Sequence, residues 1–253
     1  MLNDQELQRY SRQILLNDFD IAGQERLKAA SVLVVGLGGL GSPVALYLGA
    51  SGVGRLLLAD GDAVEPSNLQ RQVAHTENSL GSNKAESAAA AVKAINPLIK
   101  VEAIPQHLDE QALATLLEGV DVVVDATDNY PTRYALNRAC LNSCTPLVSG
   151  AAVRLEAQLT VFDPARGGPC YRCMYPQQGA EGALNCSESG VLAPVVGALG
   201  SLQALEVVKL IAGVGQTLRG RLMMLDLTTH EVRYLTLNAR EDCPDCAHLH
   251  SPE

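Results

Sequence analysis

The chain has 253 residues, of which 47% are hydrophobic and 4% aromatic, and a formal net charge of −9 at pH 7. A chain of this length can bury the core of one α/β domain, and no long Pro- or Ser-rich linker divides it. The negative charge and the few aromatic residues argue against nucleic acid as a partner. No apolar stretch reaches the roughly 18 residues that span a bilayer, and the polar residues 1–6 are unlike a signal peptide. We therefore expect a cytoplasmic protein with no nucleic-acid or membrane partner.

The first 150 residues show an alternation of predicted elements. An amphipathic helix comes first, with Leu7, Tyr10, Ile14 and Leu15 at helical spacing. Apolar runs then predict strands at 32–35, 56–60, 99–104, 122–126 and 147–149. Helical stretches lie between them at about 39–51, 83–95, 109–118 and 131–143. This order predicts a Rossmann-like, doubly wound α/β fold with a mostly parallel sheet and helices on both faces.

The pattern changes after Gly150. Runs at 157–162, 222–226 and 232–237 predict antiparallel strands that extend the sheet, and a long apolar helix is expected at about 195–212. Residues 175–190 are rich in Gly, Gln, Asn and Ser and predict a loop. We expect one domain, 1–253, made of a first half, 1–150, and a second half, 151–253.

Residues 31–41, SVLVVGLGGLG, join an apolar run to a glycine cluster and the start of a helix. A strand, a tight turn and a helix N-terminus in this order cradle a phosphate group. Gly36 permits the turn, Gly38 lets the backbone approach a phosphate, and Gly41 lets the helix pack against the strand. Asp60 follows 19 residues after Gly41 and is placed to accept hydrogen bonds from ribose hydroxyls. The sequence thus predicts a nucleotide site without identifying the nucleotide.

Four of the seven cysteines form two CxxC pairs, Cys170 with Cys173 and Cys243 with Cys246. This is the ligand spacing of a tetrahedral zinc thiolate site. Closing the long loop between the pairs costs on the order of 4 kcal/mol, whereas structural zinc supplies roughly 10 kcal/mol or more. Four thiolates leave no position for water, so such a zinc is structural. Two unrelated redox or free cysteine pairs are the alternative.

The remaining cysteines and the histidines carry weaker signals. Cys140 and Cys144 lie four residues apart on an apolar helix and are expected in the core. Cys186, in the polar loop, fits an accessible thiol. The five histidines show no metal-ligand spacing, and His248 and His250 are expected to be solvated in the tail.

Charged and amide side chains follow two of the predicted strands. Asn68 and Arg71 come after the strand at 56–60, and Lys84 lies in the first turn of a helix, where a cation is unfavourable unless an anion is near. Asp128 and Asn129 end the strand at 122–126, at the edge where α/β sheets bind ligands, and a carboxylate there suits Mg²⁺. Singly, Arg71 and Lys84 are equally well explained as surface charges and Asp128 as a helix cap. Together they predict a polyphosphate and metal site.

These segments resemble the MoeB/ThiF/HesA family, the bacterial relatives of the ubiquitin-activating enzymes. The matching segments are 9–13 (RYSRQ), 36–41 (GLGGLG), 67–72 (SNLQRQ), 125–129 (DATDN) and 148–152 (VSGAA), together with the two CxxC pairs. The resemblance covers nearly the whole chain and is far more specific than a glycine fingerprint alone.

The resemblance implies an adenylyltransferase with ATP, Mg²⁺ and Zn²⁺ as cofactors. Its substrate would be a small ubiquitin-like sulfur carrier, whose C-terminal glycine carboxylate attacks the α-phosphate to give an acyl-adenylate and pyrophosphate. The 1–150 half would bind ATP, and the 151–253 half would bind the carrier and zinc. The resemblance also implies a homodimer and a separate sulfur-donor protein. Members that act on a MoaD-like carrier in molybdopterin synthesis match best, and members that act on a ThiS-like carrier in thiamin synthesis are the alternative.

The resemblance also implies roles for single residues. ATP contacts fall on Gly36, Gly38, Gly39, Gly41, Asp60, Ser67, Asn68, Leu69, Gln70, Arg71, Lys84, Asp128 and Asn129. Catalytic roles fall on Arg71, Lys84 and Asp128, of which Asp128 would hold Mg²⁺. A further catalytic role falls on Arg12, which would reach in from the partner subunit. Cys186 is either the site of a covalent sulfur conjugate, as in thiamin-type members, or a spectator thiol.

The carrier tail would pass the small residues Gly150, Ala151 and Ala152, near Arg154. Two other classes of function stay open. An NAD-dependent oxidoreductase fits the glycine fingerprint but has no need of Arg71, Lys84 and Asp128 in one crevice. A non-enzymatic, zinc-stabilised nucleotide sensor would bind ATP without releasing pyrophosphate.

Overall fold

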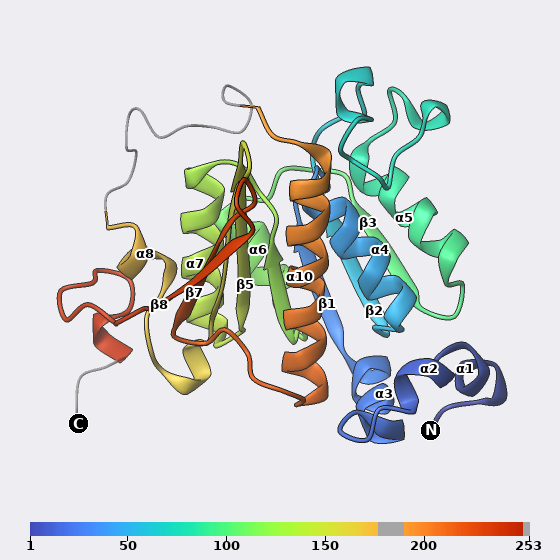
Figure 1. Cartoon of the computed structure of the whole chain (residues 1–253), viewed down its shortest axis with the longest axis horizontal. Helices are drawn as coiled ribbons and strands as arrows, with labels where there is room; N and C mark the ends of the chain where they lie inside the picture. Colours follow the sequence, from blue (N-terminus) through green and yellow to red (C-terminus); the bar gives the residue numbers. More distant parts are fainter. Residues whose placement is uncertain (177–189, 250–253) are drawn as a thin grey trace.

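The computed structural model describes residues 1–176 and 190–249, and its centre is one eight-stranded sheet of order β3-β2-β1-β4-β5-β6-β7-β8 (Figure 1). The parallel strands are β1 (Ser31–Val35), β2 (Arg55–Ala59), β3 (Lys100–Ile104), β4 (Val122–Asp125) and β5 (Leu147–Val153). The antiparallel strands are β6 (Glu156–Phe162), β7 (Arg221–Asp226) and β8 (Glu231–Thr236). The predicted Rossmann-like sheet with an antiparallel extension is confirmed.

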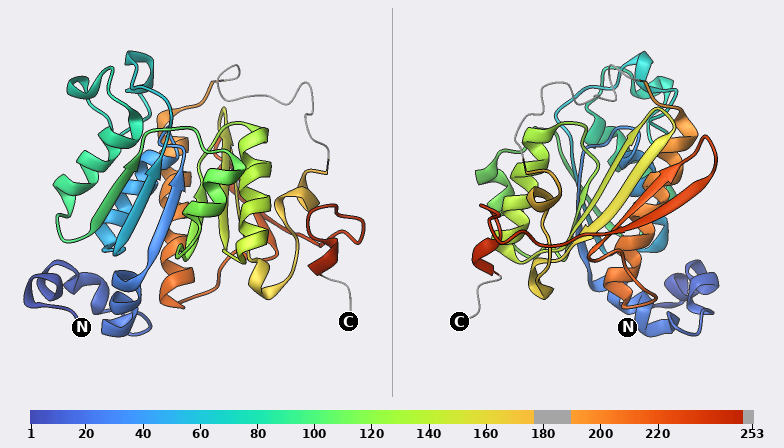
Figure 2. Two further views of the ribbon diagram at one scale, coloured as in Figure 1. Left: turned by 180° about the vertical axis from the view of Figure 1, so that it is seen from behind. Right: turned by 60° about the vertical axis from the view of Figure 1, so that its left-hand side comes forward.

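Helices cover both faces of the sheet (Figures 1 and 2). One face carries α4 (Gly41–Ser51), α5 (Lys84–Ile95) and α10 (Ala193–Ala212), and the other carries α6 (Glu110–Leu116) and α7 (Tyr130–Ser143). The short elements are α8 (Tyr171–Met174), η1 (Pro66–Asn68), η2 (Glu77–Ser79), η3 (Pro164–Arg166) and η4 (Ala247–Leu249). Val32 of β1 belongs to the hydrophobic cluster on one face and Leu33 to the cluster on the other. Because successive side chains of a strand point to opposite faces, β1 is buried on both sides.

Helix α10 corrects one expectation. It has 20 residues with a mean hydropathy of 1.6, so an apolar stretch long enough to cross a membrane does exist, by length and composition only. Half of that stretch is buried inside the protein, against α4, β5 and β6. Its buried residues Val195, Leu199 and Val207 belong to the same core cluster as Val32. The apolar character of α10 is therefore explained by packing between the sheet and α4.

The N-terminal segment differs from the single helix that was expected. It forms α1 (Asp4–Arg9), α2 (Ser11–Ile14) and α3 (Asp20–Ala29), at the amino ends of the central strands (Figure 1). The break between α1 and α2 falls at Tyr10, which is buried and accepts a hydrogen bond from Asn96 Nδ2 at 2.8 Å. Helix α3 shows almost no amphipathic pattern, which is why periodicity did not predict it.

Of the two cysteines expected in the core, only Cys140 is buried there. The expectation for Cys144 was wrong, because α7 ends at Ser143 and Cys144 is its exposed C-cap, with a left-handed φ of 54°. A left-handed residue turns the chain away from the helix axis, so the helical spacing no longer places its side chain against the core.

Candidate active site

The glycine turn between β1 and α4 has the geometry that its sequence predicts. Gly36 has a φ of 88°, and a Cβ there would lie 2.8 Å from the carbonyl oxygen of Ala126. A Cβ on Gly41 would lie 1.7 Å from the carbonyl oxygen of Gly36. Both positions therefore require glycine, the first for backbone conformation and the second for space. Asp60 Oδ2 accepts a hydrogen bond of 2.7 Å from the backbone N–H of Leu37, so this carboxylate also holds the turn.

A pocket of about 240 Å³ opens over the turn, at the carboxyl ends of β1, β2 and β4, where α/β sheets bind ligands. The predicted site residues that line it are Gly36, Gly38, Gly39, Asp60, Asn68, Arg71, Lys84, Asp128 and Asn129. Ser67, Leu69 and Gln70 do not line it, and Gly41 lies behind the turn in α4. The fold thus brings together side chains from four separate segments of the first half, and we call this cavity the nucleotide pocket.

Two cationic side chains border the nucleotide pocket. Lys84 is the first residue of α5, which Asn83 caps, and its buried Nζ lies 2.8 Å from Asp62 Oδ2. The helix dipole opposes a cation at this end, and the carboxylate of Asp62 offsets that cost. Arg71 donates from Nη1 to the carbonyl oxygen of Ser67 at 3.1 Å. Both cations line the same pocket as the backbone of the glycine turn, and this combination of cations and backbone N–H groups suits an anionic ligand.

Asp128 lies where the nucleotide pocket meets a second cavity of about 470 Å³ over the other half of the sheet. Helix α7 is capped by Asn129, whose Oδ1 accepts a hydrogen bond from the Thr132 backbone N–H at 3.0 Å. The interpretation of Asp128 as a helix cap is therefore wrong. Its exposed carboxylate faces both cavities, which is the position that a Mg²⁺ ligand needs if the metal is to contact phosphate oxygens.

The second cavity, which we call the groove, has small side chains in part of its wall. Ala151 and Ala152 line it, together with side chains from α7, β6, β7 and β8. Arg154, which was expected nearby, is exposed and does not line it. Gly150 does not line it either, because a Cβ there would lie 2.6 Å from Gln203 Cδ, so this glycine makes room for α10.

Three residues that line or support the site are absent from the predicted site residues. Gln72 is buried in the wall of the nucleotide pocket, and it belongs to the SNLQRQ segment, which was the available signal. His75 Nε2 lies 2.9 Å from the carbonyl oxygen of Leu37 and Nδ1 lies 2.9 Å from Ser87 Oγ. Burial lowers the pKa of His75, so we assign a neutral ring that donates to Leu37 and accepts from Ser87. Arg133 lines both cavities, and no local pattern points to it.

Two other predicted residues lie elsewhere. Arg12 is exposed on α2, at the opposite end of the sheet from the glycine turn (Figure 1). Cys186 lies outside the described residues, as do His250 and residues 177–189 of the predicted loop.

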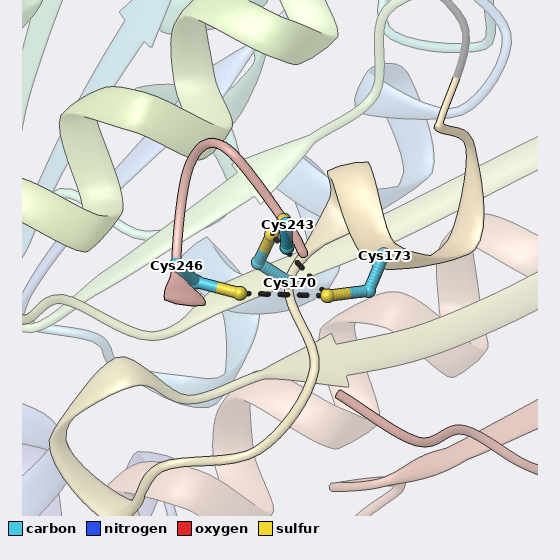
Figure 3. A group of neighbouring side chains, drawn as sticks. All are labelled: Cys170, Cys173, Cys243 and Cys246. Atoms are coloured by element: carbon cyan, nitrogen blue, oxygen red, sulfur yellow. Dashed lines mark hydrogen bonds between the residues drawn. The ribbon is translucent and has the colours of Figure 1, made fainter. Parts of the chain in front are cut away.

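The four paired cysteines come together as predicted (Figure 3). Their Sγ atoms all lie within 4.8 Å of one another, and all four residues are buried. Sγ–Sγ distances are 3.9 Å for Cys170 and Cys173, 3.7 Å for Cys170 and Cys243, and 3.4 Å for Cys173 and Cys246. Four thiolates around a tetrahedral zinc lie about 3.8 Å apart. The donor set therefore fits zinc and contradicts the alternative of two unrelated pairs.

Neighbouring N–H groups support this cysteine cluster. The Arg240 backbone N–H donates to Cys173 Sγ at 3.4 Å, and Asn137 Nδ2 donates to Cys170 Sγ at 3.7 Å. Burial raises the pKa of Cys170 to about 12, so a metal ion that binds here must displace the thiol proton. Hydrogen bonds of this kind orient the ligands of a metal site and stabilise thiolate charge.

The parallel sheet, the glycine turn and the pocket at the carboxyl ends define the class of nucleotide-binding α/β proteins. Residues 10–246 match the ThiF family model, and the chain belongs to the ThiF family. It is 47% identical over 245 residues to the molybdopterin-synthase adenylyltransferase of Salmonella typhimurium, covering 97% of this chain and 98% of that one, and the Escherichia coli enzyme of the same name gives the same figures. The solved structure of E. coli MccB with MccA-N7isoASN superposes with a TM-score of 0.82 at 25% identity, over 94% of this chain and 74% of that one.

Proposed function

We propose that this chain is an adenylyltransferase that transfers AMP from ATP to the C-terminal glycine carboxylate of a small ubiquitin-like sulfur carrier and releases pyrophosphate. The name of its relatives supports a MoaD-like small subunit of molybdopterin synthase as the carrier. The position of Asp128, shared by the nucleotide pocket and the groove, carries this proposal. A protein that only bound a nucleotide would need the first cavity but not its junction with the second.

The reaction brings a carboxylate anion against a polyanion, so charge neutralisation and positioning supply most of the catalysis. Lys84 and Arg71 stand where phosphate charge would lie, and Asp128 would hold Mg²⁺. The walls formed by Ala151 and Ala152 suit a tail without side chains, such as Gly-Gly. In this proposal the cysteine cluster holds a structural zinc with no open position, so the metal takes no part in the reaction.

The proposed homodimer gives Arg12 its role. A third, apolar cavity of about 830 Å³ is lined by α4, α10 and the N-terminal segment, and its residues Leu16, Tyr47 and Leu205 are 60, 55 and 50% exposed. Exposed apolar patches of this kind mark protein interfaces. Val196 of the same helix α10 lines the nucleotide pocket, so the layer formed by α4 and α10 adjoins that pocket. In the proposed dimer a partner bound here brings its own Arg12 to the pocket. An external protein would donate the sulfur.

The direct test incubates the protein with Mg-ATP and candidate carriers. Carrier-dependent ATP–pyrophosphate exchange and a carrier whose mass rises by one AMP are expected, most strongly with a MoaD-like carrier. ATP binding with no carrier-dependent exchange would contradict the proposal and favour a sensor. A ThiS-like carrier that stays covalently attached, and is released in Cys186→Ser, would favour the thiamin-type alternative.

The trans role of Arg12 has a separate test. Arg12→Ala and Asp128→Ala proteins are each expected to be nearly inactive. Mixed under conditions that exchange subunits, they should recover about a quarter of wild-type exchange, because half of the dimers are mixed and each has one intact site. No recovery with verified mixed dimers would place Arg12 in the site of its own subunit or outside catalysis.

A further inference from the structure

Arg133 is buried at the point where the nucleotide pocket meets the groove. It lies near the start of α7, is 9% exposed and lines both cavities. Its Nη2 donates to the carbonyl oxygens of Thr127 at 2.5 Å and Gly150 at 3.3 Å. Thr127 directly precedes Asp128, and Gly150 directly precedes the small wall of the groove. One guanidinium group thus holds the backbone beside the carboxylate and the backbone beside the groove.

Strands β4 and β5 share no ladder hydrogen bonds at the level of the Arg133 side chain. The pairing of β4 with β5 ends at Asp125 opposite Ser149. Beyond that pair, one chain leads to Asp128 and α7, while β5 continues along the groove and pairs only with β6. The hydrogen bonds of Arg133 bridge the two chains beyond the last paired residues. Their separation therefore depends on a side chain instead of on the sheet.

The charge of Arg133 is already balanced inside the protein. Its Nε lies 3.8 Å from Oδ2 of Asp125, a residue with no exposed surface. Asp125 is itself fixed, since it accepts hydrogen bonds from the Thr127 N–H and hydroxyl, at 3.1 and 2.7 Å, and from the Ser149 hydroxyl at 2.8 Å. Although burial opposes the charged form, Asp125 raises the pKa of Arg133 above its ordinary value. A neutralised buried pair exerts little net field on a ligand, so Arg133 is no second phosphate cation like Arg71.

We propose that Arg133 is a positioning residue that sets the distance between Asp128 and the Ala151–Ala152 wall. This inference rests on the proposed function, in which the metal and the carrier tail approach the α-phosphate from these two sides. Reacting groups must be held at about 3 Å, and a misplacement of 1 Å costs on the order of 100-fold in rate. The two N–H bonds of Nη2 lie in the rigid plane of the guanidinium group and are aimed at two separate carbonyl groups, whereas the ammonium group of lysine rotates freely and sits on a more flexible stem.

The test compares Arg133→Lys with Arg138→Lys, which makes the same change on the same helix, where Arg138 pairs with Glu110 at the surface. The rate of carrier-dependent exchange is divided by the number of ATP-binding sites measured without carrier. For Arg133→Lys we expect this corrected kcat to fall about tenfold or more. The Mg²⁺ concentration for half-maximal ATP binding should rise several-fold, while ATP affinity at saturating Mg²⁺ stays unchanged. Arg138→Lys should match the wild type in every measurement.

A second variant covers the case in which Arg133→Lys fails to fold. The double change Arg133→Met with Asp125→Asn removes both charges, leaves no buried ion unpaired, and should lower the corrected kcat about 100-fold. A corrected kcat and Mg²⁺ dependence equal to those of Arg138→Lys would overturn the inference. So would a loss of activity that only follows a loss of ATP-binding sites, since that is the result of a merely structural role.

The outcomes also separate this inference from the proposed function. If the wild type shows no carrier-dependent exchange, the proposed function is contradicted. The Mg²⁺ dependence of ATP binding still decides whether Arg133 positions Asp128, because that measurement needs no carrier.

Discussion

The nucleotide pocket and the cysteine cluster are held together in different ways. The backbone floor of the pocket is one short segment, β1, the glycine turn and the start of α4, in which Gly41 packs on Gly36 only five positions away. The cluster joins Cys170 to Cys243, which lie 73 positions apart. Backbone conformation specifies the first region, and the chemistry of four ligand atoms specifies the second. We therefore expect the first region to tolerate no Cβ on Gly36 or Gly41, and the second to fail when one sulfur is removed.

Aromatic side chains connect the cysteine cluster to the groove. Tyr171 lies between the ligands Cys170 and Cys173, and its ring centroid is 5.4 Å from that of Tyr134 on α7 and 5.1 Å from that of Tyr175. Tyr175 lines the groove. Loss of the metal should therefore disturb the groove before it disturbs the glycine turn.

Cys246→Ser should give the largest effect. It removes one of four ligands, so we expect loss of bound zinc and a fall of roughly 5 kcal/mol in the free energy of unfolding, part of the 10 or more that a complete structural site supplies. Metal analysis and thermal melting measure both quantities. Cys144→Ser, an exposed cysteine outside the cluster, is the control and should match the wild type. A zinc-free Cys246→Ser protein that melts like the wild type would show that the cluster is not structural.

Asp128→Asn should give the next largest effect, this time on activity and not on stability. Removing the carboxylate charge that would hold Mg²⁺ should lower carrier-dependent exchange by about 100-fold, or about 3 kcal/mol in the activation barrier. Because Asp128 is exposed and caps no helix, the melting temperature of the Asp128→Asn protein should equal that of the wild type. Glu118→Gln, at an exposed position after α6, is the control. Normal exchange in Asp128→Asn would remove this residue from the metal site.

How far the sequence predicts this structure depends on how local each feature is. The strands, the glycine turn and the helix at Lys84 follow from adjacent residues, and their bounds differ from expectation by at most four residues. The two CxxC pairs of the cysteine cluster lie far apart in the chain, yet their spacing and ligand chemistry predict that they come together. Both kinds of feature carry their own signal in the residue types.

Features that depend on long-range geometry carry no such signal. Arg133 acts through the carbonyl of Gly150, 17 positions away, and any backbone oxygen offers the same acceptor. The exposure of Cys144 depends on where α7 ends, and helix ends are the least certain part of a sequence prediction. The burial of α10 likewise depends on its contacts with α4 and β5, which are distant in sequence.

Gly41→Ala and Gly38→Ala sharpen the comparison within the glycine turn. A Cβ on Gly41 meets the Gly36 carbonyl oxygen at 1.7 Å, whereas one on Gly38 meets only Gln72 Nε2, at 3.6 Å. We expect Gly41→Ala to lower the free energy of unfolding by about 2 kcal/mol, as overpacking does, and to weaken ATP binding. Gly38→Ala should leave stability nearly unchanged and affect ATP binding alone. Denaturant unfolding and ATP titration measure the two effects, and equal stability losses would contradict this assignment of space.

His75 gives the smallest effect and a pH dependence. Burial lowers its pKa in the folded state, whereas the unfolded chain binds a proton near pH 6.5. Below that pH the unfolded state binds more protons than the folded state, so the free energy of unfolding falls as the pH is lowered. The contribution of the neutral His75 to stability is therefore complete above pH 6.5 and is lost below it. His75→Gln keeps a donor for the Leu37 carbonyl but does not titrate, so its melting temperature should fall less between pH 7.5 and pH 5.5 than that of the wild type. His230→Asn, at an exposed left-handed position that Asn tolerates, should keep the wild-type slope. If His75→Gln keeps that slope too, the neutral ring of His75 does not stabilise the glycine turn, and Asp60 and Ser42, which also bond the Leu37 backbone, fix it.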